Sequence, residues 1–502
     1  MSKKGSKNIV FGLLNQFITI SFGLILPRMF IMSYGSEVNG LISSINQVFV
    51  YVSLLEAGIG TASLQALYKT ISANDTNATN GVLSATHHFY KKTGFYYLLA
   101  VIVLSFGYPL IVDSSIPFWT TFFVIFFNGL GGVINYFFQG KFRIFLRAEG
   151  KNYLLSNLSS IIYIATSFSK ILFIKLGFSI VLIQFAHFIL TVAQMLFIML
   201  YIKKHYKWID LSVKPDKESI ASKNSVMVHQ VTNLLFSNTD ILILTLLSGL
   251  KSVSVYSLYN SFFTMLKSIL FSFLDGFQYA LGQTFNSDFI KFKKLQELFE
   301  SCYITLTFLL YSIMYSLITP FIRIYTSGIS DVNYLDPFIP LLFTLIYLLQ
   351  GARGPMQLIS EYACHFKQTR AQAIIEAIIN LSVSVISVYF YGIYGVLFGT
   401  IVALLYRANA IIIYVNKHIL QRSPLITYKR WGWCFSIFLI IFIANYYLSL
   451  SAKSYIQLIL LAIPVCAATA GLYLGGMFLF EREAFLWLIS YVKGKILPNR
   501  TT

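Results

Sequence analysis

Long apolar segments separated by short polar connections repeat along the whole chain. The first runs from Asn8 to Met32, and a membrane-spanning helix needs roughly 20 apolar residues. The turn at 34–38 then separates it from a second long segment. This pattern predicts an all-α polytopic membrane protein with about 14 transmembrane helices. The expected spans are 8–33, 39–67, 94–113, 117–138, 152–175, 178–202, 222–249, 253–284, 297–326, 336–360, 370–390, 393–416, 430–450 and 455–479.

The distribution of Lys and Arg supports this number of spans. Hydrophobic residues make up 57% of the 502 positions and charged residues 11%, whereas a soluble domain has about 25% charged residues. Alternate connections hold about 29 of the Lys and Arg residues, and the other connections hold only four. The positive-inside rule then predicts that both termini are cytoplasmic in the plasma membrane. Topology therefore accounts for most of the net charge of +19 without a nucleic-acid partner.

After loops and span ends are set aside, nine charged residues remain at membrane depth, where a charge is costly and normally faces a bundle interior or a wet cavity. We take the bases as candidate ligands of an anion and the acids as candidate coupling or gating groups. For Arg28, Lys170 and Arg407 the alternative is snorkelling to the membrane interface, and for Glu56 and Asp275 it is pairing with loop lysines. Asp240 shares a helix face with His229 and could relay protons with it; the alternative is that His229 is an ordinary packing residue. The bases are Arg28, Lys170, Lys267, Arg353 and Arg407, and the acids are Glu56, Asp240, Asp275 and Glu376.

Polar residues share helix faces with many of these charges. At spacings of three, four and seven, Asn39, Ser43, Asn46 and Ser53 lie on one face with Glu56. A hydrated cavity shared by several helices explains such stripes. The alternative is that Ser, Thr and Asn hydrogen-bond across packed membrane helices.

Three local features complete the expected architecture. Pro355 in Gly351-Ala352-Arg353-Gly354-Pro355 predicts a kink or break in its span. The segment 484–495 has the composition of an interfacial helix. A weak repeat relates the stretch that ends at Glu56 to the stretch that ends at Asp275, which implies two halves of equal orientation. We expect lobes over 1–203 and 204–420, and a terminal helix pair with a cytosolic tail over 421–502.

Enzymatic and metal-binding motifs are missing from the sequence. It has no phosphate-binding Gly-Lys loop, no His-Glu-x-x-His and no nucleophile elbow, and its four cysteines lie far apart. The connections on the outer side are too short to build a polymerase site. We therefore expect a transporter, not an enzyme, with no cofactor and no metal.

Two blocks carry a resemblance to a known superfamily. The first runs from Leu26-Pro27-Arg28 through Tyr34-Gly35-Ser36-Glu37-Val38 to Glu56-Ala57-Gly58-Ile59-Gly60. The second runs from Arg353-Gly354-Pro355 through His365-Phe366-Lys367-Gln368-Thr369 to Tyr391-Gly392-Ile393-Tyr394-Gly395-Val396-Leu397-Phe398-Gly399-Thr400. The chain resembles the multidrug/oligosaccharidyl-lipid/polysaccharide exporters and, among them, the bacterial flippases for undecaprenyl-diphosphate-linked repeat units of capsule, exopolysaccharide or O-antigen.

The resemblance implies two six-helix lobes in a V, two extra C-terminal helices and alternating access. It also implies that basic cavity residues hold the diphosphate of a lipid-linked oligosaccharide while the prenyl tail stays among membrane lipids. Glycosyltransferases and a polymerase of the same pathway are the expected protein partners. A multidrug exporter of the same fold and a flippase for the peptidoglycan precursor are the alternatives.

Overall fold

The computed structural model describes residues 3–56, 58–220 and 239–496, and its side chains over most of 18–490. Every regular element in these ranges is helical. The chain divides into two compact units, Met1–Val255 and Tyr256–Thr502. Ten helices in the described part are long and apolar enough to cross a membrane. The predicted boundaries at residues 203 and 420 stay predictions.

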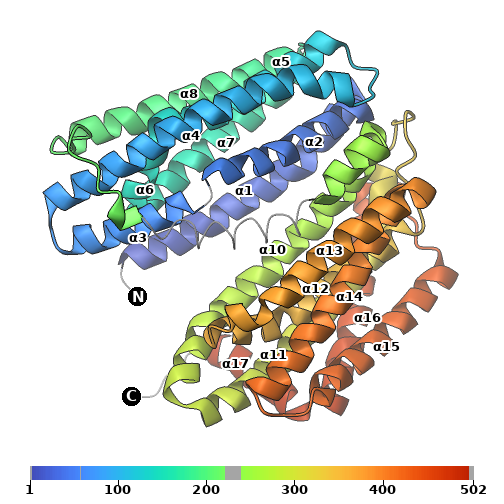
Figure 1. Ribbon diagram of the computed structural model, residues 1–502. Helices are drawn as coiled ribbons and strands as arrows, with labels where there is room; N and C mark the ends of the chain where they lie inside the picture. Colours follow the sequence, from blue (N-terminus) through green and yellow to red (C-terminus); the bar gives the residue numbers. More distant parts are fainter. Residues whose placement is uncertain (1–2, 57, 221–238, 497–502) are drawn as a thin grey trace. The chain divides into compact units, whose positions relative to one another are not determined.

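In unit 1, α4, α5 and α8 pack side by side, and α1 packs on α7 (Figure 1). Buried apolar side chains of α2, α4 and α5, such as Leu41, Val101 and Val124, form its larger core. A second core gathers around Leu83 and Phe145. The elements are α1 (Lys3–Tyr34), α2 (Ser36–Val52), the 3-10 turn η1 (Ser53–Glu56), α3 (Ile59–Ser72), α4 (Thr76–Ile111), α5 (Phe118–Ile134), the π-helical turn η2 (Asn135–Gln139), α6 (Gly140–Ala148), α7 (Asn152–Lys175), α8 (Ile180–His205) and the 3-10 turn η3 (Glu218–Ile220).

In unit 2, α11 is the central helix and packs against α12, α15, α16 and α17, while α14 packs on α12 and α13 (Figure 1). Phe299, Met356 and Ile412 belong to the buried cluster between α11, α12 and α14. The elements are α10 (Leu250–Ser287), which begins in unit 1, α11 (Phe289–Tyr325), α12 (Ile339–Tyr362), α13 (Phe366–Tyr391), α14 (Ile393–His418), α15 (Leu425–Leu448), α16 (Tyr455–Phe480) and α17 (Arg482–Ile496).

The second predicted span, 39–67, is not one helix. It ends as η1 at Glu56 and resumes as α3 at Ile59. Gly58 caps α3 with a φ of 88°, a left-handed conformation that side-chain-bearing residues rarely adopt. The break therefore lies directly after the carboxylate of the first sequence block.

The predicted break in the tenth span is wrong. Helix α12 is continuous from Ile339 to Tyr362, with Pro355 inside it. Close packing against α11 accompanies this continuity, since a Cβ added at Gly351 would lie 2.4 Å from Cγ2 of Thr307. The two glycines before Pro355 thus serve a close helix–helix contact.

Several helices are longer than the predicted spans. Helix α4 begins at Thr76, capped by the side chain of Asp75, and not near residue 94. Residues Gly140–Ala148 form α6, whereas the sequence pattern places them in a connection. The predicted helix at 484–495 is present as α17. The polar extensions of these helices were mistaken for loops because they lack the hydropathy of a span.

Candidate functional site

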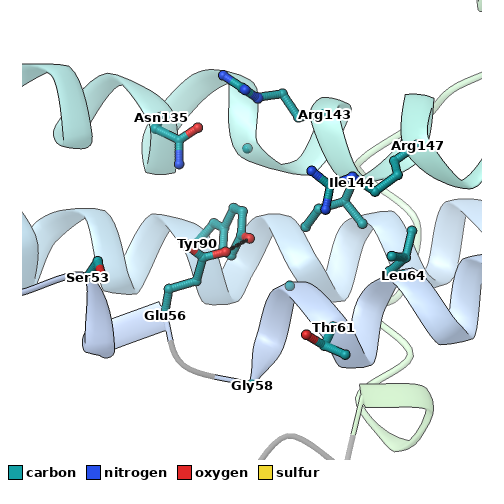
Figure 2. Close-up of a pocket in the computed structure, with 12 residues that line it drawn as sticks. Ser53, Glu56, Gly58, Thr61, Leu64, Tyr90, Asn135, Arg143, Ile144 and Arg147 are labelled. Carbon is teal, nitrogen blue, oxygen red and sulfur yellow. Dashed lines mark hydrogen bonds between the residues drawn. The ribbon is translucent and has the colours of Figure 1, made fainter. Parts of the chain in front are cut away.

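The first cavity of unit 1 lies at the break between η1 and α3. It measures about 360 Å³, and its lining includes Glu56, Tyr90, Arg143 and Arg147. In Figure 2, Glu56 and Tyr90 lie close together, and Arg143 and Arg147 come from one neighbouring helix. The buried Tyr90 hydroxyl donates a hydrogen bond to Oε1 of Glu56. The cavity thus combines one carboxylate, held by a phenol, with two guanidinium groups.

A second, larger cavity in unit 1 has a different charge pattern. It measures about 500 Å³, and Lys170, Arg143 and His187 contribute its ionisable nitrogen groups. Hydroxyl and amide side chains complete the polar part of the wall, among them Ser167 and Gln194. None of its lining residues is Asp or Glu. Arg143 lines both cavities and therefore connects the two polar sites.

The cations of these two cavities form no ion pair among the described residues, although Glu56 shares the first cavity with Arg143 and Arg147. The side chains of Lys170, Arg143 and Arg147 form no ion pair and no hydrogen bond within that part of the chain. Lys151 and Glu149, 3.7 Å apart, make the one ion pair of unit 1 in the described ranges. An ammonium group at membrane depth is expensive unless it is paired or lines a wet cavity. The second cavity gives Lys170 a polar lining of hydroxyl and amide groups.

A third cavity lies within unit 2 and measures about 290 Å³. Lys267 and Arg353 both line it, so the structure brings two of the predicted bases together. The Lys267 ammonium donates to Oε1 of Gln350 at 3.1 Å. Nη1 of Arg353 lies 2.6 Å from Oε1 of Glu376.

Glu376 also binds a second predicted base. Nε of Arg407 lies 3.4 Å from Oε2 of Glu376. Nη1 of Arg407 donates to Oε1 of Gln372 at 2.9 Å. Arg407 does not belong to the lining of the third cavity. One predicted coupling acid and two predicted anion ligands therefore form a buried ion cluster.

The remaining predicted site residues are placed less distinctly. Arg28 is half-buried and lies outside the linings of both unit 1 cavities, although Leu26 lines the second. Asp240 is half-buried next to Thr239, which bonds the Tyr51 hydroxyl. The Asp275 side chain and the residue His229 lie outside the described parts of the structure.

Several stripe residues hold helices together, as the alternative interpretation predicted. Asn39 donates to Ser254 at 2.8 Å, and Asn128 donates to Asn46 at 3.1 Å. Asn380 likewise donates to Thr400. These amides hydrogen-bond across packed helices, and Asn128 also lines the second cavity.

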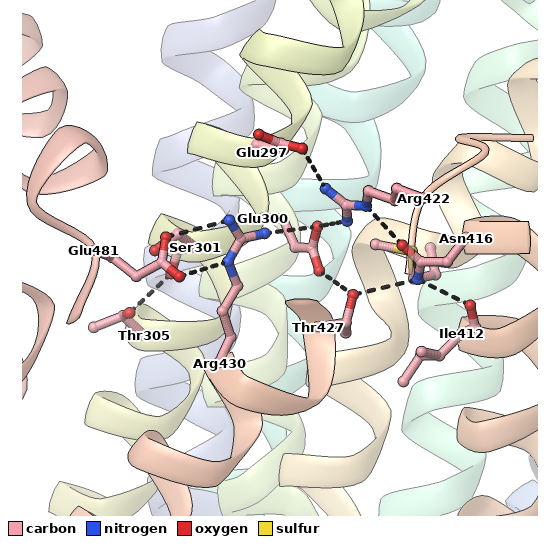
Figure 3. A network of polar contacts seen from close by, with 11 residues as sticks. Glu297, Glu300, Ser301, Thr305, Ile412, Asn416, Arg422, Thr427, Arg430 and Glu481 are labelled. Atoms are coloured by element: carbon pink, nitrogen blue, oxygen red, sulfur yellow. Dashed lines mark hydrogen bonds and ion pairs between the residues drawn. The ribbon is translucent and has the colours of Figure 1, made fainter. Parts of the chain in front are cut away.

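A network that the sequence analysis missed surrounds Glu300 on α11 (Figure 3). This fully buried carboxylate pairs with Arg422 and with Arg430, the latter at 2.9 Å. Arg430 also binds Glu481 at 3.0 Å. The two arginines were counted as topology signals. Glu297 and Glu300, one helical turn apart in an apolar segment, were the signal that could have revealed their partners.

Arg143 and Arg147 were missed for the same reason. Both were assigned to a cytosolic connection, and their spacing of four residues next to Gly140 was the available signal of a common helix face.

Solved structures show which fold carries these cavities. A lipid II flippase MurJ in an inward closed conformation matches with a TM-score of 0.69 at 14% identity, covering 93% of this chain and 98% of that chain. An inward-facing multidrug resistance MATE family transporter of the MOP superfamily matches with a TM-score of 0.62 at 15% identity, over 79% of this chain and 94% of that one. This chain has the fold of a MOP-superfamily transporter.

A third MOP-superfamily transporter, from Pyrococcus furiosus, matches with a TM-score of 0.54 at 16% identity, over 83% of this chain and 96% of that chain. No family model matches the sequence, and the search of curated proteins finds no match. The predicted fold class, an all-α polytopic membrane protein, is confirmed. The chain is therefore a multi-pass membrane protein built like transporters and flippases.

Proposed function

We propose that this protein is a flippase that moves undecaprenyl-diphosphate-linked oligosaccharide repeat units across the plasma membrane by alternating access, for capsule or exopolysaccharide synthesis. The second cavity of unit 1 carries the proposal, because Lys170 and Arg143 line it and no carboxylate does. A diphosphate supplies the negative charge that such a cavity lacks. The match to a lipid II flippase over nearly the full length of both chains supports a lipid-linked substrate.

The proposed chemistry is binding without a reaction. Arg143 can offer a planar pair of donors to a phosphoryl group, and Lys170 a compact charge. Ser167, Thr166 and Tyr163 in the same wall can donate to the remaining oxygens. A few dispersed cations bind more weakly than a closed cage, which allows release on the other side of the membrane. The prenyl tail stays in lipid and needs no protein site.

Glu56 has a proposed gating role in the same unit. Its carboxylate and Arg143 line one cavity, while Arg143 also lines the cavity with Lys170. A bound diphosphate would compete with Glu56 for Arg143. The helix break at Gly58 lies two residues after Glu56, so a change at Glu56 would act directly on the break. In unit 2, Lys267 and Arg353 remain predicted anion ligands, and Glu376 holds Arg353 and Arg407 in a buried ion cluster. Arg28, Asp240 and Asp275 remain predicted site residues.

Two alternatives share the fold. A multidrug exporter is favoured by the MATE neighbour, but a cavity for cationic drugs needs acids as its dominant charges, and the larger cavity has none in its lining. A peptidoglycan-precursor flippase carries the same diphosphate with a different head group. Deletion of the gene separates the three functions, since only one of them predicts loss of surface polysaccharide with normal drug resistance and normal cell-wall growth.

The direct test replaces Lys170 with Ala and uses Lys175→Ala, an exposed position on the same helix, as the matched control. We expect Lys170→Ala to reduce surface polysaccharide at least about 10-fold at unchanged membrane abundance, because a charge-assisted bond is worth about 1.5–3 kcal/mol. Lys175→Ala should export normally. Equal export by the two variants would remove Lys170 from the mechanism.

A further inference from the structure

The third cavity, in unit 2, differs from the cation-lined cavity of unit 1 in the groups that it offers to a ligand. Its polar wall consists of amides, phenols and charges that already have partners. Nε2 of Gln357 donates to Oε1 of Glu361 at 3.3 Å, and Lys267 donates to Gln350. Arg353 is held by Glu376. These contacts fix the orientation of the groups. Lys267 and Glu361 carry opposite charges in the same lining, and Glu376 balances Arg353, so the wall has little net charge for a phosphate.

Two buried phenols in this wall have no hydrogen-bond partner. Tyr303 is 5% exposed and Tyr311 is 1% exposed, and neither hydroxyl bonds to a described residue. A third lining tyrosine, Tyr347, is satisfied by Asn260 and by Thr264, both at 2.8 Å. Buried hydroxyls normally find a partner. The partner of Tyr303 and Tyr311 must therefore come from the cavity, as a ligand or as water.

The ligand that fits such a wall is neutral and rich in hydroxyl groups. Amide and carboxylate groups present donors and acceptors side by side, and phenol hydroxyls can do either. A sugar hydroxyl needs both an acceptor and a donor. The volume of about 290 Å³ lies at the small end for ligand pockets, which suits a single sugar unit.

We propose that the third cavity is a carbohydrate subsite that binds one sugar unit of the glycan head, with Tyr303, Tyr311, Gln350 and Gln357 as ligands. This inference rests on the proposed function, because it assumes that the cargo carries a glycan. On this proposal, unit 2 binds part of the glycan, while the diphosphate site in unit 1 stays as proposed above.

The test measures binding of free sugars to the purified full-length protein in lipid nanodiscs. The probes are glucose, galactose, N-acetylglucosamine and glucuronic acid, detected by saturation-transfer NMR. The variant is Tyr311→Phe. The matched control is Tyr315→Phe, one turn further along α11, where the ring packs on Phe442 and lies outside the cavity lining.

We expect at least one sugar to bind saturably, with an affinity about 3- to 10-fold lower in Tyr311→Phe and unchanged in Tyr315→Phe, the effect of losing one neutral hydrogen bond. Gln357→Ala should also lower the affinity for the same sugar. If no sugar binds, or if the two phenylalanine variants are indistinguishable, the cavity holds water only and the inference is wrong.

Inorganic pyrophosphate, titrated in parallel, separates this failure from that of the proposed function. Pyrophosphate binding should depend on Lys170 and be unaffected by Tyr311→Phe. Weaker pyrophosphate binding in Tyr311→Phe would make the third cavity an anion site and overturn the carbohydrate subsite. Sugar binding without any pyrophosphate binding would count against the diphosphate site of unit 1 and leave the sugar subsite standing.

Discussion

Four arginines of unit 2 and three cavity-lining cations of unit 1 differ in whether a carboxylate lies beside them. In unit 2, Arg353, Arg407, Arg422 and Arg430 each lie within 4 Å of a carboxylate, and their side chains are 6–13% exposed. In unit 1, Lys170, Arg143 and Arg147 line cavities and have no such partner in the described ranges. A cation whose charge is already matched stabilises the fold, whereas an unmatched cation beside a cavity is available to a ligand.

The largest effect is expected from breaking the network in unit 2. Glu300→Ala leaves Arg422 and Arg430 without the carboxylate that they share, and removing one partner of a buried pair costs about 3–5 kcal/mol. We expect a large drop in the midpoint of thermal unfolding in detergent. Glu297→Ala is the control, since its side chain is 45% exposed and should cost at most about 1 kcal/mol. Equal midpoints would mean that the network contributes nothing to stability.

A somewhat smaller effect is expected at Glu376, because its arginine partners are more exposed than Arg430. Glu376→Ala should cost about 2–4 kcal/mol by leaving Arg353 and Arg407 uncompensated. Replacing Arg407 by Met in the same protein should recover part of this loss, and a double-mutant cycle on unfolding midpoints measures the coupling. Strict additivity of the two changes would show that the residues do not form a cluster.

In unit 1, the one carboxylate of the first cavity depends on a phenol. Tyr90→Phe removes the hydrogen bond to Glu56 and should lower stability by about 1–2 kcal/mol. Tyr96→Phe on the same helix is the control, because that residue is 47% exposed. Thermal unfolding of the two variants measures the difference, and an unchanged midpoint for Tyr90→Phe would contradict a structural hydrogen bond.

The smallest effect on stability is expected at Lys170. Lys170→Met removes a charge that has no ion-pair partner in the described residues. The free energy of unfolding should therefore fall by no more than about 0.5 kcal/mol, or rise. The same unfolding measurement applies. A loss comparable to that of Glu300→Ala would mean that Lys170 has a counter-ion and would remove the contrast between the units.

The sequence predicted the helical fold and the turn at Gly35 because hydropathy and turn chemistry are local signals. It also singled out Lys170, Lys267 and Arg353, which line cavities in the structure. It failed where partners are distant along the chain, as in the pairing of Arg422 with Glu300. Helix packing also overrode local preference, since Pro355 lies inside a continuous helix while the break falls at Gly58. Arg143 was missed because α6 is too polar to be recognised as a continuation of a span.

The most direct test of the unmatched cations measures binding of a short prenyl diphosphate, geranyl diphosphate, to the purified protein by calorimetry. Lys170→Met should weaken binding at least about 10-fold, while Lys175→Met should leave it unchanged. Equal affinities of the two variants, or an undiminished affinity in Lys170→Met, would contradict the claim that the unpaired charges of unit 1 hold the diphosphate.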